Sequence, residues 1–277
     1  MRAHFAFSAS VGRVHRTAAV LFAVMLSLLS ASAPAQTLAP EVVARFDRGD
    51  RLARALISTV RCAGSVAQAR EDGLFGPLDS LGGNGQCVTA DGKRVGIFFD
   101  ADSQLTHVTR FSAVDLGTRA RRIAPLDTLA ILALARAERT GQMRGITAFE
   151  DAHRPYAPLA FRFDGDSIEV WIFPVAVVTG QPPSVGGERG YVFSPDGRTL
   201  VREVDAFADF RSIAVADTGT VYLTSRSMDV PTLSEFVLAN ALNGQGRTVS
   251  IVTPWGQSVL AGRGAQSVWM QLVKPRR

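Results

Sequence analysis

Two glycines followed by two opposite charges form the most unusual stretch of this sequence. Gly186 and Gly187 precede Glu188 and Arg189, and a predicted strand begins at Gly190. Paired glycines accept backbone angles that other residues avoid, so a ligand or a partner can approach the main chain closely. The alternative is a flexible lead-in to a hairpin. Because no helix follows the glycines directly, the stretch is not a phosphate-binding loop.

Arg226 and Glu235 are the other charged residues that we include in this candidate ligand or partner site. Two carboxylates can do general acid–base work without a histidine. A hydrolase built from Glu188, Arg189 and Glu235 is therefore one hypothesis. Glu235 also has a local explanation, because it stands three residues after Thr232, at the spacing of a helix capping box.

The familiar catalytic and metal-binding motifs are missing from the sequence. It contains no GxSxG, no Ser-x-x-Lys and no HExxH. After residue 35 only two histidines occur, His107 within a predicted strand and His153 within a polar loop. Asp100 and Asp102 resemble the start of a calcium loop, but its glycine and closing glutamate do not follow. We predict no catalytic residue, no metal ligand and no cofactor, and we lean towards a non-enzymatic protein.

The first 35 residues are typical of a cleavable export signal. Three arginines and no acid precede an apolar run at 18–29, and a small-x-small pattern ends at Ala35. We expect cleavage after Ala35. The alternative is an uncleaved membrane anchor, but a spanning helix needs about 20 apolar residues and this run is shorter. The sequence predicts a periplasmic or secreted protein with no transmembrane anchor after cleavage.

Removal of the signal changes the charge of the protein. The whole chain has 30 basic and 25 acidic residues, a net charge of +5. Without the three signal arginines, 27 basic residues face 25 acidic ones, a net charge of +2. Nucleic-acid binders concentrate positive charge on one face, whereas these arginines are spread among acids. We therefore expect no nucleic-acid partner.

Cys62 and Cys87 are the only cysteines of the chain. An exported protein with two cysteines most simply forms one disulfide. Two free buried thiols are the alternative. The bond would join a predicted helix to a predicted strand.

The elements that must position these residues fall into two segments, which we predict as domains at 36–120 and 121–277. Apolar residues at helical spacing predict a helix from Pro40 to about Val60 in the first segment. Alternation and an Asp-Gly turn predict a three-stranded meander after it, at 86–89, 94–99 and 105–111.

The second segment begins with an apolar helix at 126–140, which we expect Gly141 to end. Turn residues between extended runs predict strand pairs at 159–163 with 168–174, 190–193 with 199–204, and 212–215 with 221–224. A helix at 232–242 and a last meander at 249–252, 258–260 and 268–272 complete the prediction. The fold class is α+β, with antiparallel sheets built from hairpins and two or three packing helices.

The stretch 221–260 places a strand, a helix entered through Thr232 and Glu235, and a strand pair in sequence. This layout resembles the closing half of a JAB/MPN metallopeptidase domain. By that resemblance Glu235 stands for the metal-binding Asp and Thr232 for the Ser. Tyr222 and Thr224 stand where the two histidine ligands would be, and neither can replace a histidine on zinc. The resemblance implies a non-catalytic relative of that fold.

These observations favour an exported, non-enzymatic protein that binds an envelope protein or a small ligand. The carboxylate and arginine hydrolase, the JAB/MPN-like domain and a self-associating structural protein stay open. A pocket with two facing carboxylates about 5 to 9 Å apart would favour the hydrolase. A flat surface with an exposed apolar patch would favour a docking protein.

Overall fold

Helix α2 (Pro40–Glu71) is the first element of the computed structural model. The structure describes residues 39–75, 84–90, 93–116, 127–148, 156–174, 183–204, 211–215, 219–225 and 230–273. The predicted signal, His153 and Arg226 lie outside these residues. Ala39–Leu272 group into one unit by their contacts. That grouping does not test the domain boundary that we predict near residue 120, which stays a prediction.

Helix α2 is longer than its apolar spacing predicted. Pro40 suits its first turn, where a missing backbone N–H costs nothing, and the helix runs on past Val60 to Glu71. Cys62 therefore lies within it and is bonded to Cys87 of β1 (Asn84–Ala90), with the two Cα atoms 5.9 Å apart. The predicted disulfide between helix and first strand is confirmed.

Strands β1, β2 (Lys93–Ala101) and β3 (Val108–Asp115) form an antiparallel meander, as predicted. The predicted start of the third strand at Leu105 was wrong. Leu105 has a φ of 56° and its N–H donates to the carbonyl of Asp102, so the chain turns there. The side chain of Asp102 accepts further bonds within the same turn, from the N–H groups of Thr106 and His107.

This meander packs against two helices. Val95, Ile97 and Phe99 of β2 lie in a cluster with residues of α3 (Thr128–Ala148). Phe98 of the same strand lies in another cluster, with Val66 and Ala69 of α2. Because side chains alternate along a strand, the two clusters occupy opposite faces of the sheet.

Helix α3 does not end at Gly141 as predicted, but continues to Ala148. A Cβ at Gly141 would lie 2.7 Å from Val170, and one at Gly145 would lie 2.2 Å from Ile172. Both glycines therefore let the helix approach a sheet closely. Here packing outweighs the low helix propensity of glycine, which costs about 1 kcal/mol per residue.

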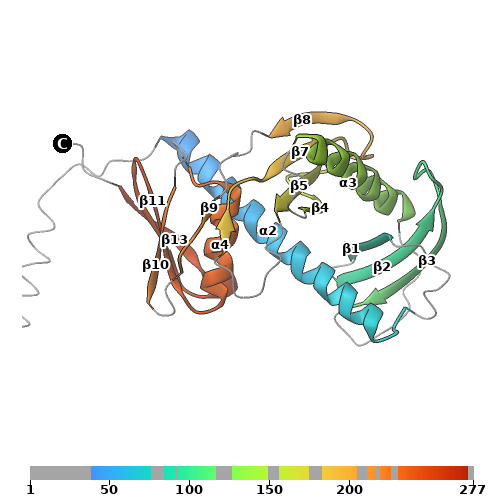
Figure 1. Cartoon of the computed structure of the whole chain (residues 1–277), viewed down its shortest axis with the longest axis horizontal. Coiled ribbons are helices and arrows are strands. Elements are labelled where there is room, and N and C mark those ends of the chain that lie inside the picture. The colour runs from blue at the N-terminus through green and yellow to red at the C-terminus, as the bar shows by residue number, and fades with distance from the viewer. Residues whose placement is uncertain are drawn as a thin grey trace, which may run out of the picture. The chain divides into compact units, whose positions relative to one another are not determined.

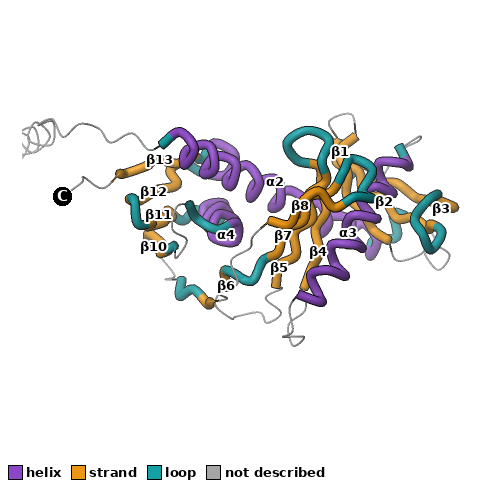
Figure 2. The backbone as a smooth tube through the Cα atoms, turned by 90° about the horizontal axis from the view of Figure 1, so that it is seen from above, coloured by secondary structure: helices purple, strands orange, loops and turns teal. Residues whose placement is uncertain are grey.

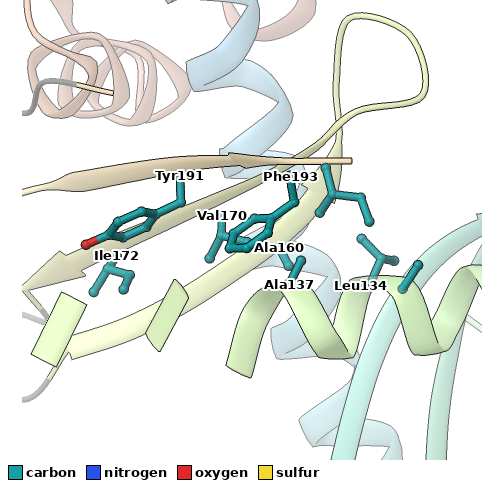
Figure 3. Packing of buried hydrophobic residues seen from close by; sticks show 9 residues of the cluster. Leu134, Ala137, Ala160, Val170, Ile172, Tyr191 and Phe193 are labelled. Carbon is teal, nitrogen blue, oxygen red and sulfur yellow. The ribbon is translucent and has the colours of Figure 1, made fainter. Parts of the chain in front are cut away.

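The sheet against α3 is antiparallel, in the order β4-β5-β7-β8. Its strands are β4 (Tyr156–Arg162), β5 (Ile168–Pro174), β7 (Arg189–Phe193) and β8 (Leu200–Val204). Both predicted strand pairs are confirmed, and β5 also pairs with β7. Figure 3 shows the helix residues Leu134 and Ala137 facing Val170 and Phe193 of the sheet, within one buried cluster.

The strand pair predicted at 212–215 and 221–224 was wrong. The short strand β9 (Arg211–Ser212) pairs with β6 (Ser184–Val185), which lies just before the paired glycines. Strand β10 (Thr220–Thr224) joins a different sheet. Turn residues between two extended runs do not say which strands pair, and residues 216–218 of the predicted turn lie outside the described residues.

The last sheet has the order β10-β11-β12-β13 and carries helix α4 (Leu233–Gly244). Its other strands are β11 (Thr248–Thr253), β12 (Gly256–Ala261) and β13 (Val268–Val273). β10 and β11 are parallel, with α4 as the connection between them, whereas β11 and β12 are antiparallel. The predicted helix and final strands are confirmed.

Three α-helices and thirteen strands in mostly antiparallel sheets make the described part an α+β fold, as predicted. Helix α2 connects its parts, because it contacts β1 and β2 as well as β4 and α4 (Figures 1 and 2). Within the described ranges, no helix combines the length and hydropathy needed to cross a bilayer.

Candidate functional site

A cavity of about 630 Å³ lies between the first half of α2, strands β5 and β8, Glu188 just before β7, and the start of α4. We call it the α4 cavity. Its lining is mostly apolar, with three arginines and one acid among the described residues: Arg45, Arg48, Gly49, Leu52, Trp171, Glu188, Arg202, Val204, Val230, Pro231, Thr232, Leu233 and Phe236. The site is thus an apolar hollow with a few charged groups.

The first turn of α4 forms one wall of the cavity. Thr232 caps the helix: its hydroxyl accepts from the N–H of Glu235 at 3.3 Å, and Glu235 Oε2 accepts from the N–H of Thr232 at 2.9 Å. This is the capping box that the spacing of the two residues predicted. The cap fixes where α4 begins, and hence the direction of its free N–H groups.

The paired glycines lie against this turn. Gly186 and Gly187 have φ angles of 89° and 73°, a region that strongly favours glycine. The N–H of Gly186 donates to the hydroxyl of Ser234 at 2.8 Å, and the N–H of Ser234 donates to Glu188 Oε1 at 3.2 Å. The close approach that the glycines predicted is therefore made by α4 itself.

Glu188 is a buried acid on the cavity wall. It is 2 % exposed, and its Oε2 has no hydrogen-bond partner among the described residues. Burial raises the pKa of Glu188 above its ordinary value, and the nearby charge of Glu235 adds to the rise, while hydrogen bonds from its own N–H and from Ser234 oppose it. The carboxyl is thus biased towards its neutral form.

Glu235 has a different environment, although the two acids share one helix terminus. Its Oε1 lies 2.6 Å from Arg211 Nη2, and the side chains are 2 % and 18 % exposed. Arg211 also donates to the carbonyl of Thr224. Glu235 is bonded to Arg211 and to the helix cap, and it does not line the cavity. Glu188 is therefore the sole carboxylate in the described lining.

Two residues of the predicted site do not join Glu188 in the cavity. Arg189, the first residue of β7, is half-buried and is not part of the described lining. Arg226 lies outside the described residues. The structure thus brings Gly186, Gly187, Glu188 and Glu235 together at the start of α4.

Sequence reasoning missed the charged residues that α2 and the sheet contribute. Arg48 pairs with the buried Glu169 and lies 3.5 Å from Asp164. The indole of Trp171 donates to the same Glu169 at 2.9 Å. Arg202, on the edge strand β8, is exposed. The pairing of Arg48 with Glu169 spans 121 residues, so no local pattern indicates it.

The other groups singled out in the sequence do not assemble a site. His107 is exposed in a bend before β3. The side chain of Asp102 accepts hydrogen bonds from backbone N–H groups of the same turn. Tyr222, which stands where the resemblance expects a histidine, is 66 % exposed on β10. Across the ranges that the structure describes, no three His, Cys, Asp or Glu side chains gather to hold a metal ion.

Family models, curated proteins and solved structures were compared with this chain. None of them matches it. The resemblance to the JAB/MPN layout therefore stays a prediction, and the function is argued from the geometry of the α4 cavity.

Proposed function

We propose that this chain is an exported, non-enzymatic binding protein whose small-molecule ligand occupies the α4 cavity. The cavity carries the proposal. At about 630 Å³ it lies in the range of about 300 to 1,000 Å³ typical of small-molecule sites. Such sites join an apolar lining to a few converging polar groups, which is also the composition found here.

The distribution of carboxylates supports binding over hydrolysis. A two-carboxylate mechanism needs both acids to face the substrate. Here Glu188 lines the cavity, while Glu235 is held by Arg211 and by the helix cap. A single buried acid with a raised pKa can position a ligand. The described lining has no second carboxylate that could activate water.

The export part of the proposal is supported by the signal-like first 35 residues and by the Cys62–Cys87 bond. Disulfides persist in oxidising compartments such as the periplasm or the extracellular space. Intact-mass measurement of the protein recovered from the periplasm or medium tests this part. We expect a chain that begins at Gln36, whereas a chain that retains Met1 would contradict it.

A thermal-shift screen of the purified protein against small metabolites tests the binding proposal. Val230→Trp should fill the cavity, whose wall includes Val230, and abolish the stabilisation by any hit. Val201→Trp is the matched control, because Val201 is 63 % exposed on β8 and lies outside the described lining. Hits lost only in Val230→Trp support the proposal; hits that survive in both variants oppose it.

The hydrolase alternative predicts turnover. A panel of chromogenic ester, phosphate and glycoside substrates should show no activity above the uncatalysed rate. Turnover that Glu188→Gln abolishes, with the variant still folded, would replace the binding proposal by the hydrolase.

A further inference from the structure

We propose that the ligand of the α4 cavity is an anion with an apolar body, and that its charge lies towards Arg202. This inference rests on the proposed function and adds the chemical class of the ligand. A carboxylate, sulfonate or phosphate on an aromatic or aliphatic skeleton fits this description. The class follows from the charges of the wall, the state of Glu188 and the apolar surface between them.

Of the three arginines in the described lining, Arg45 and Arg48 already interact with other residues, so Arg202 is the one available to a ligand. Arg48 is already paired with Glu169 and close to Asp164, so little of its charge is left for a ligand. Arg202 makes no hydrogen bond or ion pair with any described residue, and it is exposed on β8. A guanidinium binds carboxylate, sulfonate and phosphate oxygens through paired N–H donors.

Glu188 opposes this positive charge less than an exposed carboxylate would, because its burial raises its pKa and disfavours the ionised form. Glu235 on α4 is the charged group that acts on Glu188 most directly. Arg45, Arg48 and Arg202 share the cavity lining with Glu188, and Arg189 follows it in the chain. In its neutral form the carboxyl does not repel an anion, and it has a proton to donate. Its Oε2 is buried and has no hydrogen-bond partner among the described residues.

The remainder of the wall requires an apolar body on the same ligand. Trp171 and Phe236 contribute aromatic surface, and Leu52, Val204 and Leu233 contribute aliphatic surface. Burial of apolar area contributes about 25 cal/mol per Å², whereas a small inorganic anion would leave that area uncovered. The ligand class is therefore amphipathic, and inorganic phosphate alone should bind poorly.

A matched pair of fluorescent probes tests the charge requirement on the unmodified protein. 8-Anilinonaphthalene-1-sulfonate carries a sulfonate that N-phenyl-1-naphthylamine lacks, on the same ring system. We expect the sulfonate to bind at least about tenfold more tightly, as one charge-assisted hydrogen bond predicts. Equal or tighter binding of the neutral probe, with both probes displaced by Val230→Trp, would overturn the anion inference and leave the proposed function standing.

Binding of both probes that Val230→Trp leaves unchanged would instead remove the proposed function, because the probes would then be bound elsewhere. Arg202→Ala should weaken the sulfonate about tenfold and leave the neutral probe unchanged. Arg263→Ala, which removes an exposed arginine outside the described lining, should change neither. Equal effects of the two variants on the sulfonate would contradict the role of Arg202.

The pH dependence of sulfonate binding tests the role of Glu188. A sulfonate stays ionised throughout the accessible range, so any change reports on the protein. Affinity should fall as pH rises through the pKa of Glu188, because the ionised carboxyl repels the anion. Glu188→Gln should keep the low-pH affinity and flatten the profile. A profile that stays steep in Glu188→Gln, or is already flat in the unmodified protein, would contradict this role.

Discussion

The two ends of helix α2 differ in how they are stabilised. Its C-terminal part, near Cys62 and Val66, packs on the β1–β3 meander through apolar side chains and one disulfide. Its N-terminal part, near Phe46 and Arg48, faces α4 and the β4-β5-β7-β8 sheet. Two ion pairs with a nearly inaccessible acid, Arg48–Glu169 and Arg211–Glu235, lie in that second region, as does the α4 cavity.

This difference indicates a division of roles. Within its described residues, the β1–β3 meander contains one buried acid, Asp115, whereas Glu169, Glu188 and Glu235 are buried at the α4 end. Buried charges cost free energy unless they are paired, so their concentration in one region suggests a role beyond stability. On this account the β1–β3 end is the scaffold, and the α4 end binds.

The largest effect should come from breaking a buried ion pair at the α4 end. Glu235→Ala leaves Arg211 without its carboxylate and removes half of the capping box. We expect a loss of about 3 to 5 kcal/mol of unfolding free energy in urea. Glu203→Ala is the control: its pair with Arg144 is exposed on both sides, and its loss should cost about 0.5 kcal/mol. Similar losses for the two variants would refute the distinction.

At the scaffold end, reduction of Cys62–Cys87 should cost about 3 kcal/mol, because the bond closes a loop between residues 25 apart. Calorimetry with and without reductant measures this loss. If the account is right, the folded, reduced protein still binds the sulfonate probe with unchanged affinity. A loss of binding on reduction, below the unfolding temperature, would mean that the two ends are coupled.

Two glycines of α2 allow a glycine-to-alanine substitution to be compared at the two ends of the helix. A Cβ at Gly49 would lie 2.5 Å from the buried ring of Phe236, whereas a Cβ at Gly64 would meet nothing within 4 Å. Gly49→Ala should therefore destabilise the protein by about 1 to 3 kcal/mol. Gly64→Ala should stabilise it by about 0.5 to 1 kcal/mol through helix propensity. Thermal denaturation of both variants checks the opposite signs; shifts in the same direction would contradict the packing.

The smallest effect concerns pH. Because the pKa of Glu188 is raised in the folded state, its contribution to stability is present below its ordinary pKa and is lost as pH rises through the raised value. The stability of Glu188→Gln relative to the unmodified protein should therefore increase with pH. Burial also raises the pKa of Glu138, so part of the slope should remain in the variant. Parallel curves for the two proteins would argue against a buried, neutral Glu188.

Local signals in the sequence predicted much of the fold. The capping box at Thr232 and Glu235 and most strands depend on residues that are neighbours in the sequence. The Cys62–Cys87 bond was predictable because two cysteines can form only one disulfide. The continuation of α3 through Gly141 was missed, because it depends on the distant Val170. The pairing of β9 with β6 was missed for the same reason.

The candidate site shows the same division between local and distant contacts. The paired glycines indicated a close approach of the main chain, and they lie against the first turn of α4. Arg48 and Arg202 gave no signal, since a single arginine on a helix or strand looks like any solvated residue. Their place in the site depends on α2, β8 and α4 meeting at one cavity, which only the tertiary fold reveals.

Hydrogen exchange with and without the sulfonate probe tests the division of roles most directly. Amide protection should increase at 186–190 and 230–236, and in the first turns of α2, because these segments surround the α4 cavity. The β1–β3 meander should exchange at the same rate in both states. Protection centred on the meander, or spread evenly over the described chain, would contradict the account.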